Sequence, residues 1–224
     1  MSSPARATRR KPPDQRRAEI IETASAIALA DGLDKVTARR VADALGVFPG
    51  LVNHYFRTAD ELVAAAFDHA ATREHREVFG HAEEAATPLE QLQRVLNSWL
   101  TIERSDPMDV VWFDAWQASR RRPALAAVVL ERMTADLARL EALIRAGNEA
   151  AVLRAADPAA AAVCLMALVD ATSVNTAIRD AIDYTPVIEM ARTAAEATLG
   201  LPAGTLGRRS AVNGEPDRAV TERP

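Results

Sequence analysis

Polar side chains between Thr37 and Arg57 are the best suited in this sequence to chemistry with another molecule. The amide of Asn53 both donates and accepts hydrogen bonds, which matches the edge of an adenine base. Arginine guanidinium groups a few residues earlier match phosphate oxygens. We expect base contacts from Gly50, Leu51, Asn53 and His54, phosphate contacts from Thr37, Arg39, Arg40 and Tyr55, and further contacts from Phe48, Pro49 and Arg57.

Two short helices are needed to position these side chains, and the sequence predicts them. Thr37 is a good N-cap for the first helix. Its apolar face recurs at three- and four-residue steps through Val41, Ala42 and Leu45. Gly46 follows, where a helix end favours positive φ, and Pro49 suits the first turn of the second helix. Helix, glycine-bearing turn and helix form the helix-turn-helix pattern, whose second helix enters the DNA major groove.

The flanks of this pattern carry a resemblance to a known family. An amphipathic helix over roughly 15–30 precedes it and closes at Asp31-Gly32, and a capping box at 58–61 opens a long helix after it. In order and spacing, the segment resembles the DNA-binding domain of the TetR family of bacterial transcriptional repressors. The matching pieces are Ala28-x-x-x-Gly32, Thr37-x-x-x-Val41-Ala42, Leu45-Gly46-Val47, Pro49-Gly50, His54-Tyr55-Phe56 and Asp60-Glu61-Leu62.

The resemblance implies an all-α fold of about nine helices. An N-terminal three-helix helix-turn-helix DNA-binding domain would be followed by a C-terminal helical ligand-binding and dimerisation domain. It also implies a repressor that a small-molecule effector releases from double-stranded DNA. A homodimer presents two recognition helices to successive major grooves, so its operator should be near-palindromic.

Two positions depart from the family pattern. Phe48 stands where the family usually has a Ser or Thr that caps the recognition helix. Ala59 stands where the family usually has a Lys that contacts phosphate, and Arg57 is the available substitute. These departures affect individual DNA contacts rather than the fold.

Charge is distributed unevenly along the chain. The formal net charge is −4, yet residues 1–57 carry ten Lys/Arg against six Asp/Glu, and the remainder carries seventeen against twenty-five. A local basic region of this kind is typical of a nucleic-acid-binding end. The longest apolar run, 159–169, is too short to span a bilayer, and the start has no apolar signal-peptide core. With one cysteine, we predict a cytoplasmic protein without membrane contact.

Proline and capping residues mark the later helices. Their expected spans are roughly 88–104, 107–119, 123–146, 158–179 and 186–199, with Gly147-Asn148 ending the longest. We predict a disordered basic arm over 1–13, a DNA-binding domain over 14–60, a ligand-binding and dimerisation domain over 61–202 and a disordered tail over 203–224. The arm has two open interpretations: a solvated tail, or a segment that contacts the DNA backbone or minor groove.

Trp112 and Trp116 lie one helical turn apart. Their segment resembles the W-x-x-x-W stretch of the TetR subgroup that includes choline-responsive repressors of the betaine pathway. Core packing and the lining of a ligand pocket both stay open. For a pocket, we expect walls from Trp99, Trp112, Phe113, Trp116 and Met133, and polar anchors from Glu103, Asp114 and Gln117. A cation over Trp with a carboxylate nearby would suit a quaternary ammonium.

The last two predicted helices are the candidate dimer interface. The helix from Pro158 is apolar nearly all round, so it must be buried on more than one side, and the last helix has a stripe of small residues. The candidate interface residues are Leu165, Val169, Ala191 and Ala195. Cys164 lies within the apolar run, so we expect a buried, inert thiol.

Other functions have less support in the sequence. His69, His75 and His81 are spaced six apart, which does not pair metal ligands on one helix face, so we expect solvated histidines and no metal. Without a Gly-rich phosphate loop or a nucleophile elbow, we predict no enzyme activity and no cofactor. A small helical hydrolase or transferase, and a DNA-binding or scaffolding protein without a ligand, remain the alternatives.

Overall fold

The computed structural model describes residues 12–100, 107–173 and 183–207. In these ranges it has nine α-helices and one 3-10 helix, which confirms the predicted all-α class. The N-terminal part contains α1 (Pro13–Asp31), η1 (Leu33–Lys35), α2 (Ala38–Leu45) and α3 (Pro49–Tyr55). The remainder contains α4 (Ala59–Glu83), α5 (Pro88–Trp99), α6 (Pro107–Ser119), α7 (Pro123–Glu149), α8 (Pro158–Ser173) and α9 (Thr185–Leu199).

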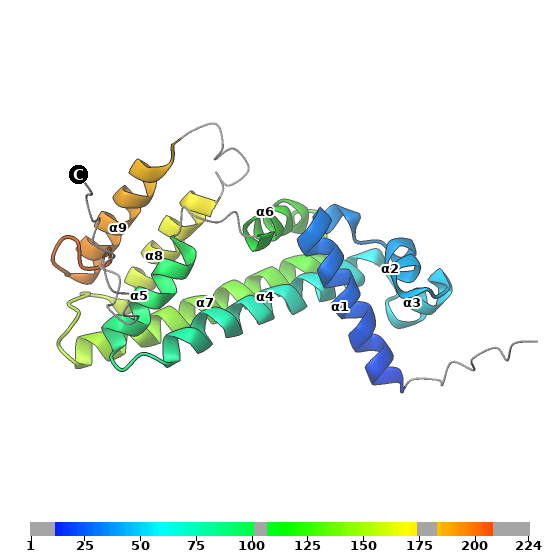
Figure 1. Ribbon diagram of the computed structural model, residues 1–224, viewed down its shortest axis with the longest axis horizontal. Coiled ribbons are helices and arrows are strands. Elements are labelled where there is room, and N and C mark those ends of the chain that lie inside the picture. The colour runs from blue at the N-terminus through cyan, green and yellow to red at the C-terminus, as the bar shows by residue number, and fades with distance from the viewer. Residues whose placement is uncertain (1–11, 101–106, 174–182, 208–224) are drawn as a thin grey trace, which may run out of the picture.

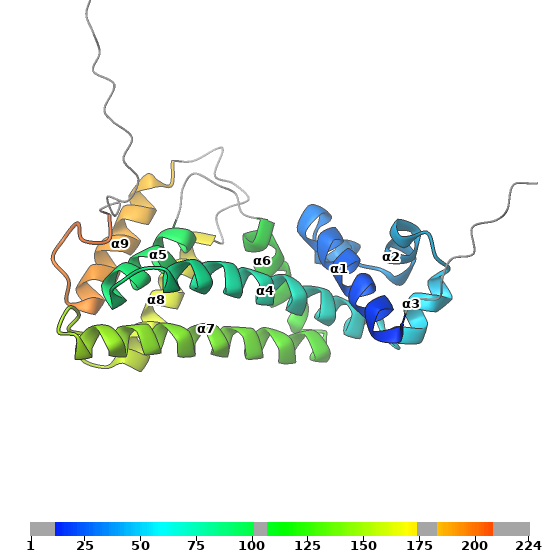
Figure 2. The same ribbon diagram turned by 60° about the horizontal axis from the view of Figure 1, so that its bottom comes forward.

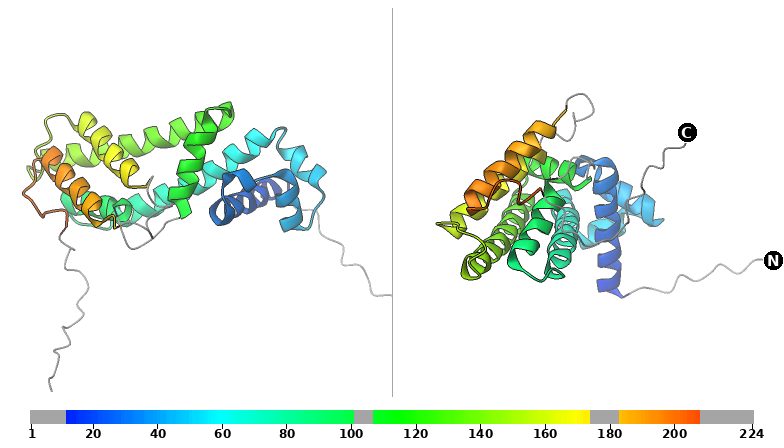
Figure 3. Two further views of the ribbon diagram at one scale, coloured as in Figure 1. Left: turned by 90° about the horizontal axis from the view of Figure 1, so that it is seen from above. Right: turned by 60° about the vertical axis from the view of Figure 1, so that its left-hand side comes forward.

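The helices form an elongated molecule (Figure 1). Helices α1–α3 lie at one end and α8–α9 at the other, and the long helices α4 and α7 run side by side between them (Figures 1 and 2). Helix α6 runs across the direction of α4 and α7, next to the N-terminal helices (Figure 3). The two ends are therefore connected mainly through α4 and α7.

Two apolar cores lie along this length. The first joins α1–α3 to α6 and to the adjoining halves of α4 and α7, and it ends at Ala71 on α4 and Val129 on α7. The second begins at Phe79 on α4 and Leu140 on α7, and it includes α5, α8 and α9. The stretch between the two cores is called the seam below.

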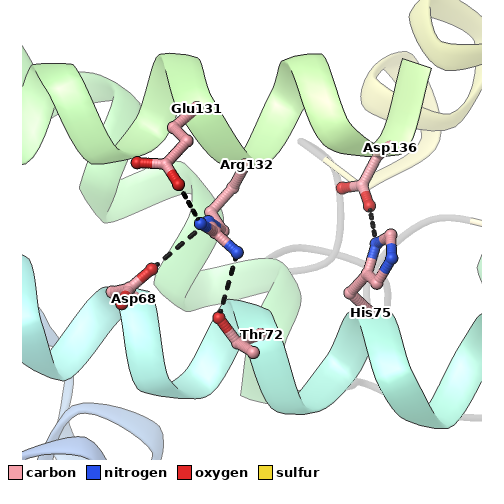
Figure 4. Close-up of polar contacts among 6 residues, drawn as sticks. All are labelled: Asp68, Thr72, His75, Glu131, Arg132 and Asp136. Atoms are coloured by element: carbon pink, nitrogen blue, oxygen red, sulfur yellow. Dashed lines mark hydrogen bonds and ion pairs between the residues drawn. The ribbon is translucent and has the colours of Figure 1, made fainter. Parts of the chain in front are cut away.

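Polar side chains connect α4 and α7 at the seam and beside it (Figure 4). Arg132 donates to the Thr72 hydroxyl at 3.2 Å and pairs with Asp68, also at 3.2 Å. One turn further along α7, the carboxylate of Asp136 is 2.5 Å from Nδ1 of His75. Partly buried polar groups are stable only with such partners. Between α4 and α7, the two cores are therefore linked by hydrogen bonds and ion pairs.

Helix α7 continues past the point where the sequence predicts its end. Gly147 lies inside the helix, and Leu153 packs directly against it: an added Cβ would lie 2.4 Å from Leu153 Cδ1. The Asn148 amide then bonds both backbone groups of Ala155, at 2.8 and 3.1 Å, and fixes the following turn. The prediction that Gly147-Asn148 ends this helix is wrong, since both residues serve the packing of the turn.

Two glycine substitutions test this packing. Gly147→Ala should lower the free energy of unfolding by about 1–2 kcal/mol. The new methyl group forces the buried Leu153 to shift, and this costs more free energy than the higher helix propensity of alanine contributes. Gly80→Ala is the matched control: it lies inside α4 with nothing within 4 Å of an added Cβ. It should raise the free energy of unfolding by about 0.5–1 kcal/mol. Denaturant unfolding of both variants measures the effect, and equal stabilisation by both would contradict the assigned role of Gly147.

The segment after α9, up to residue 207, packs against α9 and the second core. The buried carboxylate of Glu196 accepts the backbone N–H groups of Gly204 and Leu206, at 2.9 and 2.8 Å, and the Leu206 side chain is buried in the second core. The predicted disordered tail is therefore wrong for residues 203–207. Of the basic arm predicted over 1–13, residues 1–11 lie outside the described residues, and Pro13 already begins α1. The ends of the predicted helices at 101–104 and 174–179 and the tail from 208 also lie outside them. No helix in the described ranges is long and apolar enough to cross a membrane.

Candidate functional site

The turn between α2 and α3 is fixed by local hydrogen bonds. The Thr37 hydroxyl accepts the Arg40 N–H at 3.2 Å and caps α2. Gly46 adopts the left-handed conformation, with φ 65°, that ends the helix. The Val47 N–H then donates to the Ala42 carbonyl at 2.9 Å, which closes the turn. The relative position of the two helices is thus set within a dozen residues.

Helix α3 presents one polar face to solvent. Its inner face is anchored by Val52 and by Phe56 just beyond its end, both buried in the first core. The exposed residues of α3 are Pro49, Gly50, Asn53 and His54, while Leu51 and Tyr55 are half-buried. The predicted base-reading residues therefore lie together on an accessible helix. No side chain caps α3, as its departure from the family pattern implies, and Phe48 is 88% exposed at its N-terminus.

The predicted phosphate-contacting residues are also accessible. Thr37, Arg39 and Arg57 are exposed, and the Arg39 guanidinium is 3.9 Å from Asp43. Arg40 pairs with Asp31 at 2.6 Å. Exposed pairs of this kind contribute only about 0–1 kcal/mol, so a phosphate can replace the carboxylate. The Arg57 backbone N–H donates to Glu61 at 2.8 Å, which fixes this residue at the start of α4.

A second candidate site is a cavity of about 50 Å³ at the seam. Four predicted residues line it: Trp99, Trp112, Trp116 and Met133. The first comes from the end of α5, the next two from α6 and the last from α7. Seven further lining residues complete the wall, five of them titratable: Glu74, His75, Asp109, Asp136, Met166, Val169 and Asp170. Both apolar cores thus contribute to one acidic, tryptophan-lined pocket.

A hydrogen bond holds one of the aromatic walls. The Trp112 indole N–H donates to Glu74 at 2.8 Å, and its ring meets Phe67 edge to face at 4.9 Å. The Trp116 ring centroid is 5.9 Å from that of Trp112. The buried Nε1 of Trp116 has no hydrogen-bond partner among the described residues. One of the two pocket tryptophans therefore carries a buried N–H donor that no described residue satisfies.

Carboxylates make the pocket acidic. Burial raises the pKa of Asp136, although His75 and Arg132 nearby favour its ionised form. Burial also raises the pKa of Asp170 to about 6. In the described part of the chain, no side chain pairs with the Asp170 carboxylate. At neutral pH no charged side chain in the described ranges is paired with this carboxylate, and a bound cation would neutralise it.

Several predicted ligand contacts lie elsewhere. Phe113 is 47% exposed, and Gln117 is exposed in a surface cleft between α6 and η1. Each follows a pocket tryptophan by one residue, and one residue turns a helix by about 100°, which points its side chain away. Asp114 is half-buried and bonds to the backbone of η1 instead. Glu103 lies outside the described residues.

The polar wall of the pocket escaped the sequence prediction. His75 is half-buried against Asp136, so its assignment as a solvated histidine is wrong, whereas His69 and His81 are exposed. The signal was the inward stripe of α4, which runs from Phe67 through Ala70 and Ala71 to Phe79. Glu74 and His75 interrupt this stripe at inward positions. No cluster of His, Cys, Asp or Glu that could hold a metal ion occurs within 12–100, 107–173 and 183–207.

The predicted dimer-interface residues pack inside a single protomer. Leu165, Val169, Ala191 and Ala195 are buried in the second core, so they are wrong as surface contacts. The opposite faces of these helices carry exposed apolar side chains: Val163 is 56% exposed on α8 and Met190 is 60% exposed on α9. Cys164 is also exposed rather than buried, because it follows Val163 on the outer side.

Two family models match the chain. A model described as "Bacterial regulatory proteins, tetR family" matches residues 20–66, which include α2 and α3. A second, described as "BetI-type transcriptional repressor, C-terminal", matches residues 88–200, which include α6 and the helices up to α9. The two matched segments thus contain the helix-turn-helix and most of the pocket.

Known proteins and structures are also similar. The HTH-type transcriptional repressor KstR2 of Mycobacterium tuberculosis is 30% identical over 115 residues, which are 49% of this chain and 56% of that protein. The matched segment thus spans little more than half of this relative. A putative TetR-family transcriptional regulator from Rhodococcus sp. has a TM-score of 0.68 at 20% identity, covering 83% of this chain and 99% of that chain. A putative transcriptional regulator from Saccharomonospora viridis in complex with choline has a TM-score of 0.69 at 18% identity, covering 82% and 96%.

Proposed function

The chain belongs to the TetR family of bacterial regulatory proteins, and from this premise we propose that it is a DNA-binding repressor controlled by a small molecule. The observation that carries the proposal is the accessible recognition helix α3. It holds Gly50, Asn53 and His54 on one solvent-facing side, at the end of the chain where basic residues outnumber acidic ones. Arg39, Arg40 and Arg57 surround it as phosphate contacts.

We propose that the active form is a homodimer. The exposed apolar positions on α8 and α9, at the end of the molecule opposite α3, supply the contact surface (Figure 1). A two-fold axis at this end places two α3 helices on one side of the assembly. Such a dimer binds a near-palindromic operator with half-sites about 34–36 Å apart or a multiple of that distance.

We further propose that the effector is a small organic cation with a hydrogen-bond acceptor. Two tryptophan faces and the Asp170 carboxylate, which pairs with no described side chain, suit the positive charge. The Trp116 N–H, buried without a partner among the described residues, supplies a donor for the acceptor once the walls move. Choline has this chemistry, and the similar Saccharomonospora viridis protein was crystallised with it. A cavity of about 50 Å³ is several times the roughly 10–15 Å³ that one water needs. Binding a larger cation requires the walls to move, which couples occupancy to conformation.

The other function classes make different demands. An enzyme would turn over its small molecule, and a constitutive DNA-binding protein would ignore it. Because the family consists of transcriptional regulators, we propose that this chain neither catalyses a reaction nor uses a cofactor. We also propose that it acts in the cytoplasm, where the bacterial genome lies.

The proposal is tested with DNA selected from a random pool by the full chain. Asn53→Ala removes a side chain that can bond adenine and leaves α3 intact, so affinity for the best operator should fall by about 1–3 kcal/mol with little change on scrambled DNA. Arg39→Ala is the matched control, because we expect its exposed guanidinium, 3.9 Å from Asp43 in the free protein, to contact phosphate rather than bases. It should weaken binding to both DNAs by a similar factor and flatten the salt dependence.

Competition gel shifts at several salt concentrations distinguish the two effects. An Asn53→Ala protein that keeps wild-type selectivity would move base reading to His54. A wild-type protein that enriches no sequence from the pool would refute sequence-specific DNA binding.

A further inference from the structure

One hydrogen bond joins α6 to the turn that leads into the helix-turn-helix. The Leu33 backbone N–H donates to Oδ2 of Asp114 at 3.0 Å, and these residues lie 81 positions apart in the chain. Leu33 is buried, and it directly follows Gly32, which has φ 97°. A Cβ on Gly32 would lie 3.1 Å from the same carboxylate oxygen. The turn thus approaches α6 closely enough that a side chain at position 32 would disturb the bond.

The same turn is also fixed to α2. Asp31, at the end of α1, pairs with Arg40 of α2 at 2.6 Å. Between these two attachments, Val36 is buried in the first core and Thr37 caps α2. A displacement at Leu33 therefore reaches the first helix of the helix-turn-helix over only four residues of chain.

Helix α6 connects this turn to the pocket. Trp112 and Trp116 lie two residues before and after Asp114, which is about 200° around the helix in either direction. The tryptophans therefore line the pocket on one side of α6, while Asp114 faces η1 on nearly the opposite side. Clefts of about 610 and 700 Å³ flank Asp114, and Gln117 lines both of them. These clefts leave room for α6 to move relative to η1.

We propose that Asp114 is a positioning residue that transmits movement of α6 at the pocket to the helix-turn-helix. The inference rests on the proposed function and adds the path by which that function is regulated. A helix moves as a rigid unit over two turns, so a shift of Trp112 and Trp116 displaces the Asp114 carboxylate. Through the Leu33 N–H, the displacement changes the placement of η1 and α2. Linkage is reciprocal, so DNA binding must also change the surroundings of the two tryptophans.

Reciprocity provides a test that needs no effector. The chain has three tryptophans, and all of them line the pocket, so its intrinsic tryptophan fluorescence reports on this site. The full-length dimer is titrated with the selected operator, and the emission is followed to saturation, with scrambled DNA as the reference. Gel shifts on the same samples establish the bound fraction independently.

Three variants separate transmission from structural support. Asp114→Ala removes the acceptor, and its fluorescence change at full operator occupancy should fall to less than about a third of the wild-type change. Asp114→Asn keeps a carbonyl oxygen that can accept the Leu33 N–H, and it should restore at least half of the change. Gln117→Ala alters a residue on the same side of α6 that makes no hydrogen bond to a described residue, and it should behave as wild type.

The outcomes distinguish failure of this inference from failure of the proposed function. A wild type that binds no DNA in the gel shift overturns the function, and the inference with it. A wild type that binds operator without a fluorescence change beyond scrambled DNA overturns the inference alone. So does an Asp114→Ala protein with the full wild-type change, or an equal loss in the Gln117→Ala control.

Discussion

Leu165→Arg should prevent folding, whereas Ala167→Arg, two residues later, should give a folded monomer that loses its operator. The Leu165 side chain is completely buried in the second core. An unpaired guanidinium there costs several kcal/mol, out of the 5–15 kcal/mol that typically stabilises a domain. Ala167 is exposed on the outer side of α8, so the same change is tolerated within one protomer. In the proposed dimer it would bury an unpaired charge at the subunit contact.

Circular dichroism, light scattering and gel shifts distinguish these results. Ala167→Arg should melt within a few degrees of wild type, scatter as a monomer at micromolar concentration, and bind operator at least about 100-fold more weakly, because avidity across two half-sites is lost. The matched control is Ala138→Arg, an exposed position on α7, which should remain dimeric. An Ala167→Arg protein that is dimeric with wild-type operator affinity would place the interface elsewhere.

Asp170→Asn should make the protein more stable at neutral pH and insensitive to the effector. Burial raises the pKa of Asp170 from its ordinary value of 3.8 to about 6, so the folded protein binds this proton more tightly than the unfolded chain does. The resulting stabilisation is present below about pH 4 and is lost as pH rises through about 6. Removing the charge should recover on the order of 1–2 kcal/mol at pH 7.5, after allowance for screening by solvent at this partly exposed group.

Choline binding should show the opposite dependence. The ionised carboxylate is the form that attracts a cation, so wild-type affinity for choline should fall as pH drops below about 6. At pH 7.5, Asp170→Asn should bind choline at least about tenfold more weakly, a loss of about 1.4 kcal/mol. Asp43→Asn, a change to an exposed carboxylate on α2, should alter neither the affinity for choline nor its dependence on pH. Calorimetric titrations at pH 5 and 7.5 measure this, and equal wild-type affinity at both would exclude Asp170 as the cation partner.

Local signals made the helices predictable. Thr37, Thr58 and Thr87 cap α2, α4 and α5 as expected, because a capping hydroxyl and its backbone partner lie within three residues. The start of α7 at Pro123 was likewise read from one residue. Its end was not, since the glycine at position 147 makes room for Leu153, whose packing depends on the path of the chain after the helix.

The pocket and the dimer surface were only partly predictable. Trp112 and Trp116 are recognisable in the sequence, because two large aromatic side chains one helical turn apart must be buried against another part of the protein or a ligand. Asp170 and Asp136 are not recognisable in this way, because a single carboxylate on a helix is predicted to be solvated until the position of the neighbouring helix is known. Along α8, Leu165 and Val163 are equally apolar in sequence. Only the positions of α7 and α9 decide which of them faces the core of the protomer.

The division into two cores has a consequence for how this sequence can diverge. Close-packed interiors pass a change of volume to the residues they touch. Between α4 and α7 the contacts across the seam are polar, and elsewhere the pocket separates the two cores, so a substitution in the second core disturbs the first core little. Trp99, Met166 and Val169 line the pocket from the second core. A lineage can therefore exchange them to acquire a new effector while it inherits the operator recognition of α3 unchanged.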